Sequence, residues 1–126
     1  MAQDILSDAL NQIMNAKKVG KTEVTIKRNS KLLTNLLEMM KKGDYIDFNK
    51  VEDDENKLIV KIKKLNECKA IKPRFYVQIP EIEKYMRRYL PSRKFGFLAI
   101  STSNGLLTDE EAYAKNTGGS LIAYFY

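Results

Sequence analysis

Three consecutive hydroxyl residues followed by an Asn-Gly pair are the part of this sequence best suited to chemistry with a partner. The segment is Ser101, Thr102, Ser103, Asn104 and Gly105, and it directly follows an apolar, β-prone stretch. Short hydroxyl and amide side chains at a strand end hydrogen-bond at close range to phosphate, sugar or base edges. The segment therefore predicts a contact loop for a partner pressed against the backbone. The same residue types are also favoured in an ordinary strand-to-turn transition, and the sequence leaves this alternative open.

A glycine pair, Gly118 and Gly119, follows a predicted helix over residues 108–116. We expect the pair to end that helix with a residue in the left-handed conformation. Missing side chains at these positions would also let a nucleic-acid backbone come close. The helix stop alone is a sufficient explanation, so both readings stay open.

Positive charge is concentrated in the middle of the chain. The net charge is +6, but residues 61–94 contain eleven Lys or Arg and three Glu, while the rest contains eleven basic and thirteen acidic residues. Such a basic segment on a nearly neutral chain points to a polyanionic partner, although a solvated charged surface would look the same. Within it, Lys72 and Arg74 precede Phe75 and Tyr76, a mixture suited to phosphate contact and base stacking.

A second candidate phosphate site lies earlier in the chain. Asn29 or Ser30 is predicted to cap a helix, and Lys31 follows. Backbone N–H groups at a helix start bind anions, so Ser30 and Lys31 could receive a phosphate. Plain capping explains Ser30 equally well.

Several function classes are disfavoured by composition. The 126 residues include no histidine, which removes the commonest general base and most zinc sites. We therefore expect no catalytic residues, no metal and no cofactor. The single cysteine, Cys68, cannot form an internal disulfide, and we expect it to be a small buried or edge residue. No apolar run approaches a membrane span, and no secretory signal is expected.

The pattern of apolar residues predicts an α+β fold with two small lobes. Residues 1–65 form an N-terminal αβαββ lobe, with a helix from residue 4 that stops at Gly20 and a second helix that stops at Gly43. Residues 66–126 form a C-terminal, mainly β lobe with short helices, which carries the hydroxyl loop and the glycine pair. We expect these elements: helices 4–16, 30–42, 80–90 and 108–116; strands 23–26, 45–51, 57–64, 70–77, 95–101 and 121–126.

These segments together resemble a known family, the universal small-subunit ribosomal protein number eight in its archaeal and eukaryotic form. The carboxy-terminal signature is carried by residues 101–105, then Glu110-Glu111-Ala112, then Gly118-Gly119 and the apolar end 121–126. Residues 71–75 and 90–96 are similar to the archaeal/eukaryotic version. The opening helix, over residues 4–21, is also similar to that of the family.

The resemblance implies a structural protein that binds the central domain of small-subunit ribosomal RNA and assists its assembly. It implies that the C-terminal lobe, residues 66–126, binds RNA through the hydroxyl loop at 101–103, and that the amino-terminal lobe contacts RNA at Ser30 and Lys31. Beyond the resemblance, we predict RNA contacts at Asn104, Gly105, Gly118, Gly119, Lys72, Arg74, Arg93 and Lys94. The resemblance further implies a cytoplasmic, ribosomal protein of archaeal type, monomeric when free, with neighbouring small-subunit proteins as partners and no membrane. The alternatives are a general structured-RNA-binding protein, a repressor of its own message, or a carboxylate-dependent nuclease.

Overall fold

The computed structural model describes residues 5–51, 54–91 and 95–126, with the side chains of all of these except positions 54–56 and 73. The chain divides into two compact units, Met1–Glu67 and Cys68–Tyr126. Each unit has its own antiparallel sheet, so the predicted α+β fold with two lobes is confirmed.

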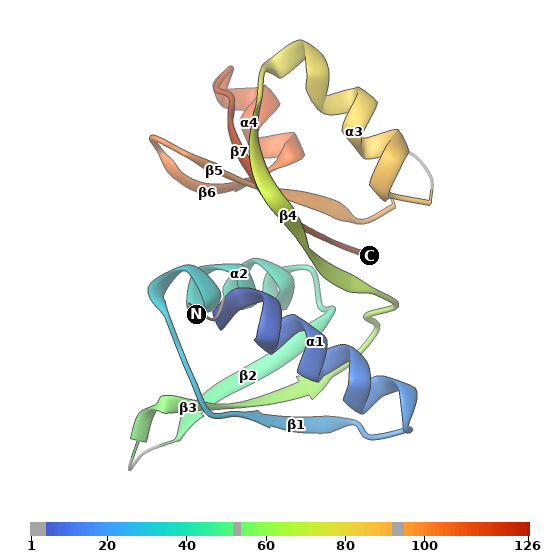
Figure 1. The fold of residues 1–126 in the computed structure, drawn as a ribbon, viewed down its shortest axis with the longest axis vertical. Helices are drawn as coiled ribbons and strands as arrows, with labels where there is room; N and C mark the ends of the chain where they lie inside the picture. The colour runs from blue at the N-terminus through green and yellow to red at the C-terminus, as the bar shows by residue number, and fades with distance from the viewer. Residues whose placement is uncertain (1–4, 52–53, 92–94) are drawn as a thin grey trace. The chain divides into compact units, whose positions relative to one another are not determined.

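The N-terminal lobe has the predicted αβαββ order. Its elements are α1 (Ile5–Lys18), β1 (Glu23–Ile26), α2 (Lys31–Lys42), β2 (Ile46–Val51) and β3 (Asp54–Ile62). The strands form a sheet in the order β1-β3-β2, and both helices lie on the same face of it (Figure 1). This leaves β1 and β2 as the two edges of the sheet.

Local signals in the sequence set the ends of both helices. Beyond α1, Gly20 takes a φ of 82°, which only glycine adopts without strain. The Lys21 N–H then donates to the Ala16 carbonyl at 2.9 Å, and the Gly20 N–H donates to the Lys17 carbonyl at 3.1 Å. These two bonds form a Schellman motif, which reverses the chain toward β1. At the start of α2, the Ser30 hydroxyl accepts from the Leu33 N–H at 3.1 Å.

Apolar side chains of α1 and α2 make the core of this lobe. Their fully buried residues recur at helical spacing, which is why the two helices can cover one sheet face. The buried helical residues are Leu6, Ala9, Leu10, Ile13, Ala16, Leu33, Leu36, Leu37 and Met40.

The C-terminal lobe contains one strand that the sequence did not predict. Its elements are β4 (Cys68–Val77), a 3-10 turn η1 (Ile79–Glu81), α3 (Ile82–Tyr89), β5 (Phe97–Thr102), β6 (Gly105–Thr108), α4 (Asp109–Lys115) and β7 (Gly119–Phe125). The unpredicted strand is β6, which pairs with β5 along its whole length. Four residues are too few to give a clear alternating pattern, so this strand depends on its partner.

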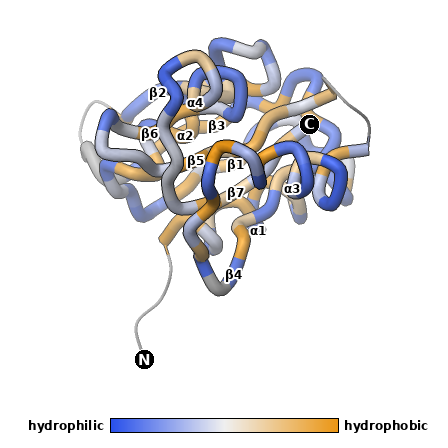
Figure 2. The backbone as a smooth tube through the Cα atoms, turned by 90° about the horizontal axis from the view of Figure 1, so that it is seen from above, coloured by the Kyte–Doolittle hydropathy of each residue, from blue (hydrophilic) through white to orange (hydrophobic). Residues whose placement is uncertain are grey.

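The sheet of this lobe has the order β4-β7-β5-β6 and is antiparallel throughout. One apolar cluster joins the sheet to α3 and α4, with Ile82 and Ala112 contributed by the helices. Along α3 the tube in Figure 2 changes repeatedly between hydrophilic and hydrophobic, as expected of a helix with one buried side. Cys68 is buried, as predicted. None of the described helices has the length and apolar character needed to cross a membrane.

Candidate nucleic-acid interface

The predicted hydroxyl loop is the tip of the β5–β6 hairpin. Thr102 and Gly105 face each other as the last pair of the ladder, so Ser103 and Asn104 form the tip. Gly105 takes a φ of 101°, whereas no described non-glycine residue other than Asp44 and Asn116 has a positive φ. A turn followed by a glycine with positive φ is a common way to close a short hairpin. Ser103 and Asn104 are exposed at this tip.

Thr102 holds the turn together through its side chain. Its hydroxyl accepts from the Asn104 N–H at 3.0 Å and donates to the Gly105 carbonyl at 2.8 Å. The hydroxyl proton is therefore committed inside the turn. By contrast, the hydroxyls of Ser101 and Ser103 make no hydrogen bond to any described residue. Within the predicted loop, Thr102 stabilises the turn, and its two serine neighbours keep their hydroxyls available.

The register of the sheet places Tyr76 and Ser120 in line with Ser101 of the loop, an arrangement that the sequence did not predict. Ser101 lies opposite Ser120 of β7 and opposite Leu106 of β6, and Ser120 in turn lies opposite Tyr76 of β4. Directly opposite residues in antiparallel strands project from the same face, about 5 Å apart at Cβ. Tyr76, Ser120, Ser101 and Leu106 thus form a row across the sheet, called the sheet row below.

The sheet row presents an aromatic ring beside two hydroxyl residues. Tyr76 is 64% exposed, an unusual value for so large an apolar ring. Ser120 and Ser101 are half-buried. The sequence singled out Tyr76 only as part of a basic and aromatic stretch, and it gave no signal for Ser120, because their neighbours come from other strands.

The glycine pair has a different geometry from the predicted one. The left-handed residue that ends α4 is Asn116, with φ 51° and ψ 47°, and neither Gly118 nor Gly119 has a positive φ. The prediction of a left-handed glycine at this stop is therefore wrong. Asparagine can take over this role because its short polar side chain tolerates the left-handed region.

Both glycines are instead needed where backbone segments pass close to one another. A Cβ on Gly119 would collide with the Ser101 carbonyl oxygen, and a Cβ on Gly118 would lie 2.5 Å from the Val77 carbonyl oxygen. The same added atom on Gly118 would lie 3.2 Å from the Tyr76 hydroxyl. Gly119 is buried. The pair thus lets the strands come together and makes room for Tyr76. An RNA contact at these glycines stays a prediction.

The predicted basic contacts lie in separate places. Lys72 and Arg74 are both exposed in β4, in the stretch where the pairing with β7 shifts between Ala70 and Phe75. This irregularity carries the two cations out of the regular ladder at the edge of the sheet. Arg93 and Lys94 lie outside the described residues. These four predicted contacts stay predictions.

Ser30 and Lys31 belong to the other lobe. Ser30 caps α2, and no acidic residue occupies the first turn of this helix. Lys31 is exposed. The position fits the anion site that the sequence predicts, and its role in RNA binding stays a prediction.

A buried carboxylate at the start of α4 is hydrogen-bonded to strand β5 of the hairpin. Asp109 is 2% exposed and accepts from the Leu98 N–H of β5 at 3.0 Å. Burial raises the pKa of this carboxyl, partly offset by its backbone hydrogen bonds. Next to it, Thr108 and Glu111 form a capping box at the start of α4, at 3.2 Å for each bond. These contacts attach α4 to the base of the hairpin.

The described part of the chain offers groups suited to binding a polar partner. No three His, Cys, Asp or Glu side chains gather there as a metal ion would require. The available groups are hydroxyls, amides, an exposed aromatic ring and cations. Such a set binds and positions a polar, anionic partner.

Known proteins resemble the chain over nearly its whole length. Residues 4–126 match the family model for Ribosomal protein S8. The chain is 38% identical to small ribosomal subunit protein uS8A of Schizosaccharomyces pombe over 127 residues, which cover 98% of each chain. It is 40% identical to small ribosomal subunit protein uS8 of Neurospora crassa over 125 residues, 97% of this chain and 96% of the relative. Because the match includes the hairpin, the glycine pair and the strands that join them, the chain belongs to the ribosomal protein S8 family.

Proposed function

We propose that the C-terminal lobe, residues 66–126, binds structured small-subunit ribosomal RNA through the hairpin tip and the sheet row. The observation that carries this proposal is the pair of available serine hydroxyls, Ser101 near the end of β5 and Ser103 in the turn that Thr102 holds together. A rigid turn loses little conformational entropy on binding, so its hydrogen bonds contribute more of their energy to affinity.

The chain is a structural component of the small ribosomal subunit, as its family membership implies. In the proposal, it contacts the central domain of the RNA and assists its folding. It is a cytoplasmic monomer when free, takes neighbouring small-subunit proteins as partners, and performs no catalysis. An archaeal source stays a prediction, because the relatives reported above are eukaryotic and fit the archaeal/eukaryotic-type form equally.

RNA offers suitable groups for each part of this surface. An RNA duplex has a shallow minor groove lined with 2′-hydroxyls, and irregular regions expose base edges and base faces. Ser101 and Ser103 can bond the sugars or base edges, while Tyr76 offers a ring on which an unstacked base can rest. Lys72 and Arg74 then supply attraction to phosphates without reading local shape.

Footprinting of the purified chain on naked small-subunit RNA tests the proposal. We expect protection of one irregular helix in the central domain. Protection spread evenly over many duplexes would favour the general RNA-binding protein. Magnesium-dependent cleavage would favour the nuclease.

The Ser101→Ala and Ser103→Ala double variant tests the site itself. Each lost hydroxyl is expected to cost about 1–3 kcal/mol of binding to the protected helix, because RNA polar groups are left unpaired. Binding to an unrelated duplex and the salt dependence should barely change, since no cation is lost. Circular dichroism checks that the variant is folded. If the folded double variant binds the RNA with full affinity, the hydroxyls of Ser101 and Ser103 take no part in RNA binding.

A further inference from the structure

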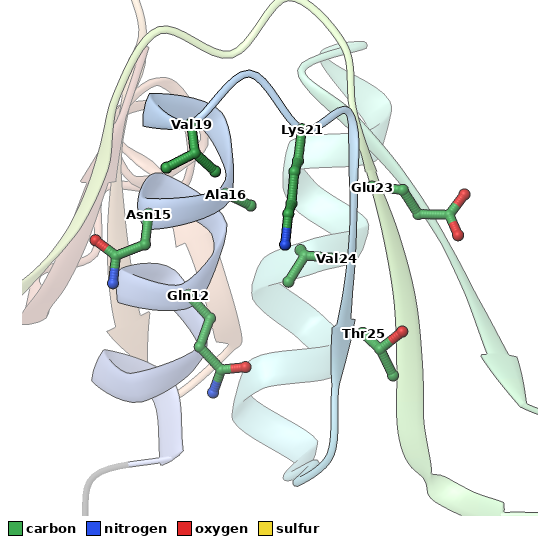
Figure 3. Close-up of a pocket in the computed structure, with 8 residues that line it drawn as sticks. All are labelled: Gln12, Asn15, Ala16, Val19, Lys21, Glu23, Val24 and Thr25. Atoms are coloured by element: carbon green, nitrogen blue, oxygen red, sulfur yellow. The ribbon is translucent and has the colours of Figure 1, made fainter.

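A groove between α1 and β1 in the N-terminal lobe has no part in the proposed RNA contacts. It has a volume of about 530 Å³ and is open to solvent. Its wall on the α1 side is made by Gln12, Asn15, Ala16 and Val19, and its other wall by Lys21 and the start of β1 (Figure 3). The Schellman motif at Gly20 creates the groove, because it folds Lys21 back between the helix and the strand.

The strand that forms one wall has an unpaired edge. Among the described strands, β1 pairs only with β3. The Ile62 N–H donates to the Thr22 carbonyl at 2.8 Å, so Thr22 directs its backbone groups toward β3. Successive residues of a strand direct these groups to alternate sides. Glu23 and Thr25 therefore direct their N–H and C=O groups outward, to the edge that borders the groove.

The opposite edge of the same sheet is less accessible to a new strand. Strand β2 has a register shift at Lys50 and Val51, and Asp47 on it is bonded to Lys41 of α2 at 3.3 Å. Bulges and charges on an edge strand discourage pairing with another chain. The ladder between β1 and β3 runs without a shift from Glu23 to Ile26. The edge of β1 is thus the one suited to strand addition.

Lys21 gives the groove a charge preference. Its side chain lies between α1 and β1, whereas the carboxylate of Glu23 points away from the groove (Figure 3). No acidic residue in the described part of the chain pairs with Lys21. Lys21 is exposed, so its ammonium is accessible to a carboxylate of a bound segment. At the end of the groove, Val19 is 71% exposed and offers an apolar contact.

From these observations we infer that the groove binds an extended, acidic peptide segment of another small-subunit protein, which adds a strand to β1. The segment pairs with the backbone groups of Glu23 and Thr25, places an Asp or Glu side chain against Lys21, and covers Val19. Backbone pairing provides affinity in this mode of recognition, and the side-chain contacts provide specificity. The inference rests on the chain's place in the small subunit.

Photo-cross-linking from inside the groove tests this inference. The variant Val19→p-benzoyl-phenylalanine is produced in cells that assemble it into small subunits. These subunits are isolated by sedimentation and irradiated, and the cross-linked products are identified by mass spectrometry. We expect a cross-link to one segment of another small-subunit protein with an acidic residue close to the cross-linked position. The same photoreactive residue at Tyr113, exposed on α4, serves as a control and should not give this product.

Two substitutions then examine the binding mode. Thr25→Pro removes an outward N–H together with the side-chain hydroxyl, and edge strands accept proline, so the lobe should fold while the cross-link yield falls about fivefold. Thr25→Val keeps the N–H and should leave the yield unchanged. Lys21→Glu should lower the yield similarly, whereas Lys18→Glu, on exposed helix surface next to the groove, should not.

Each outcome separates this inference from the proposed function. A chain that sediments with small subunits but cross-links only to RNA, to a second copy or to nothing overturns the groove inference alone. An unchanged yield in folded Thr25→Pro overturns strand addition. A chain that does not sediment with small subunits overturns both the inference and the proposed function.

Discussion

The hairpin tip and the glycine pair lie in the same lobe and use similarly small residues, but they face different neighbours. Ser103 and Asn104 are exposed beyond the last ladder pair. Gly118 and Gly119 face other backbone segments, where a Cβ would meet the carbonyl oxygens of Val77 and Ser101. The side chains of the hairpin tip are small and exposed to solvent. The two glycines lack side chains because other backbone segments of the chain occupy the space beside them.

This difference shows that a run of small residues in this chain can have two different causes. Small side chains allow a close approach, but the sequence does not say whether a ligand or another strand approaches. The two groups also depend on each other, since Gly119 packs against Ser101, which is part of the proposed contact surface. Internal packing at one group positions the available hydroxyls at the other.

The largest expected effect is on stability, from Gly119→Ala. The added methyl group would overlap the Ser101 backbone and the Thr102 side chain, and backbone cannot give way as a flexible side chain does. We expect a loss of about 3 kcal/mol in the free energy of unfolding. Urea denaturation followed by circular dichroism measures it.

Gly105→Ala is the matched control for that substitution. A Cβ there would meet no atom within 4 Å, so only its positive φ is unfavourable, at about 1–2 kcal/mol. Equal losses in the two variants would contradict the assignment of Gly119 to internal packing.

A smaller effect, on binding, is expected from Tyr76→Ala. If an RNA base stacks on this ring, the variant should lose about 1–3 kcal/mol of affinity for the protected helix. Tyr113→Ala removes another exposed tyrosine, 44% exposed on α4, and should bind as the parent does. Binding isotherms on the cognate RNA measure both. If the two variants bind equally well, the sheet row takes no part in recognition.

The Lys72→Ala and Arg74→Ala double variant separates the contribution of charge to RNA binding from the contribution of shape recognition. It should weaken binding to cognate and unrelated duplexes alike, because phosphates carry no sequence information. Each lost phosphate contact should reduce the magnitude of the salt slope by roughly 0.7 to 0.9. A salt series of isotherms gives the slope, and an unchanged slope would exclude both residues from the interface.

The smallest expected effect is a change in the pH dependence of stability, from Asp109→Asn. Burial raises the pKa of Asp109 above 3.8, so the native chain keeps this proton to higher pH than the unfolded chain does. The free energy of unfolding therefore falls as pH rises from 3.8 through the native pKa. Asparagine keeps an acceptor for the Leu98 N–H and does not ionise, so this fall should be absent. Urea titrations across acidic pH test the difference.

Asp47 in the other lobe provides a control, because its pKa is shifted in the opposite direction to that of Asp109. Its hydrogen bond from Lys41, with a further one from the Phe48 N–H, lowers the pKa of this carboxyl. Its contribution to stability is present above the unfolded pKa and is lost as pH falls through the native pKa. The parent chain should therefore lose stability at acid pH as Asp47 is protonated, and the Asp47→Asn variant should not show this loss. If both variants shift the pH profile in the same direction, one of the two assignments is wrong.

Much of the fold follows from signals within a few residues of each other. Apolar residues at helical spacing predict α1 and α2, and Gly20 predicts the end of α1. The box of Thr108 and Glu111 predicts the start of α4. Such signals are readable because helices and caps are made of bonds between near neighbours in the chain. The signature from residue 101 onward likewise indicates the ribosomal protein S8 family, whose model matches residues 4–126.

Other features depend on segments far apart in the chain. Strand β6 forms because β5 lies beside it, and the glycine pair is needed because β4 and β5 approach β7 on either side. Tyr76, Ser120 and Ser101 become neighbours only through the register of three strands, and the groove exists only where α1 passes β1. The sequence by itself predicts the hydroxyl loop and the basic residues as RNA contacts, and it determines most of the local elements that carry them. The tertiary structure decided which of them are adjacent and which have free groups, because strand register and packing depend on contacts that no local pattern contains.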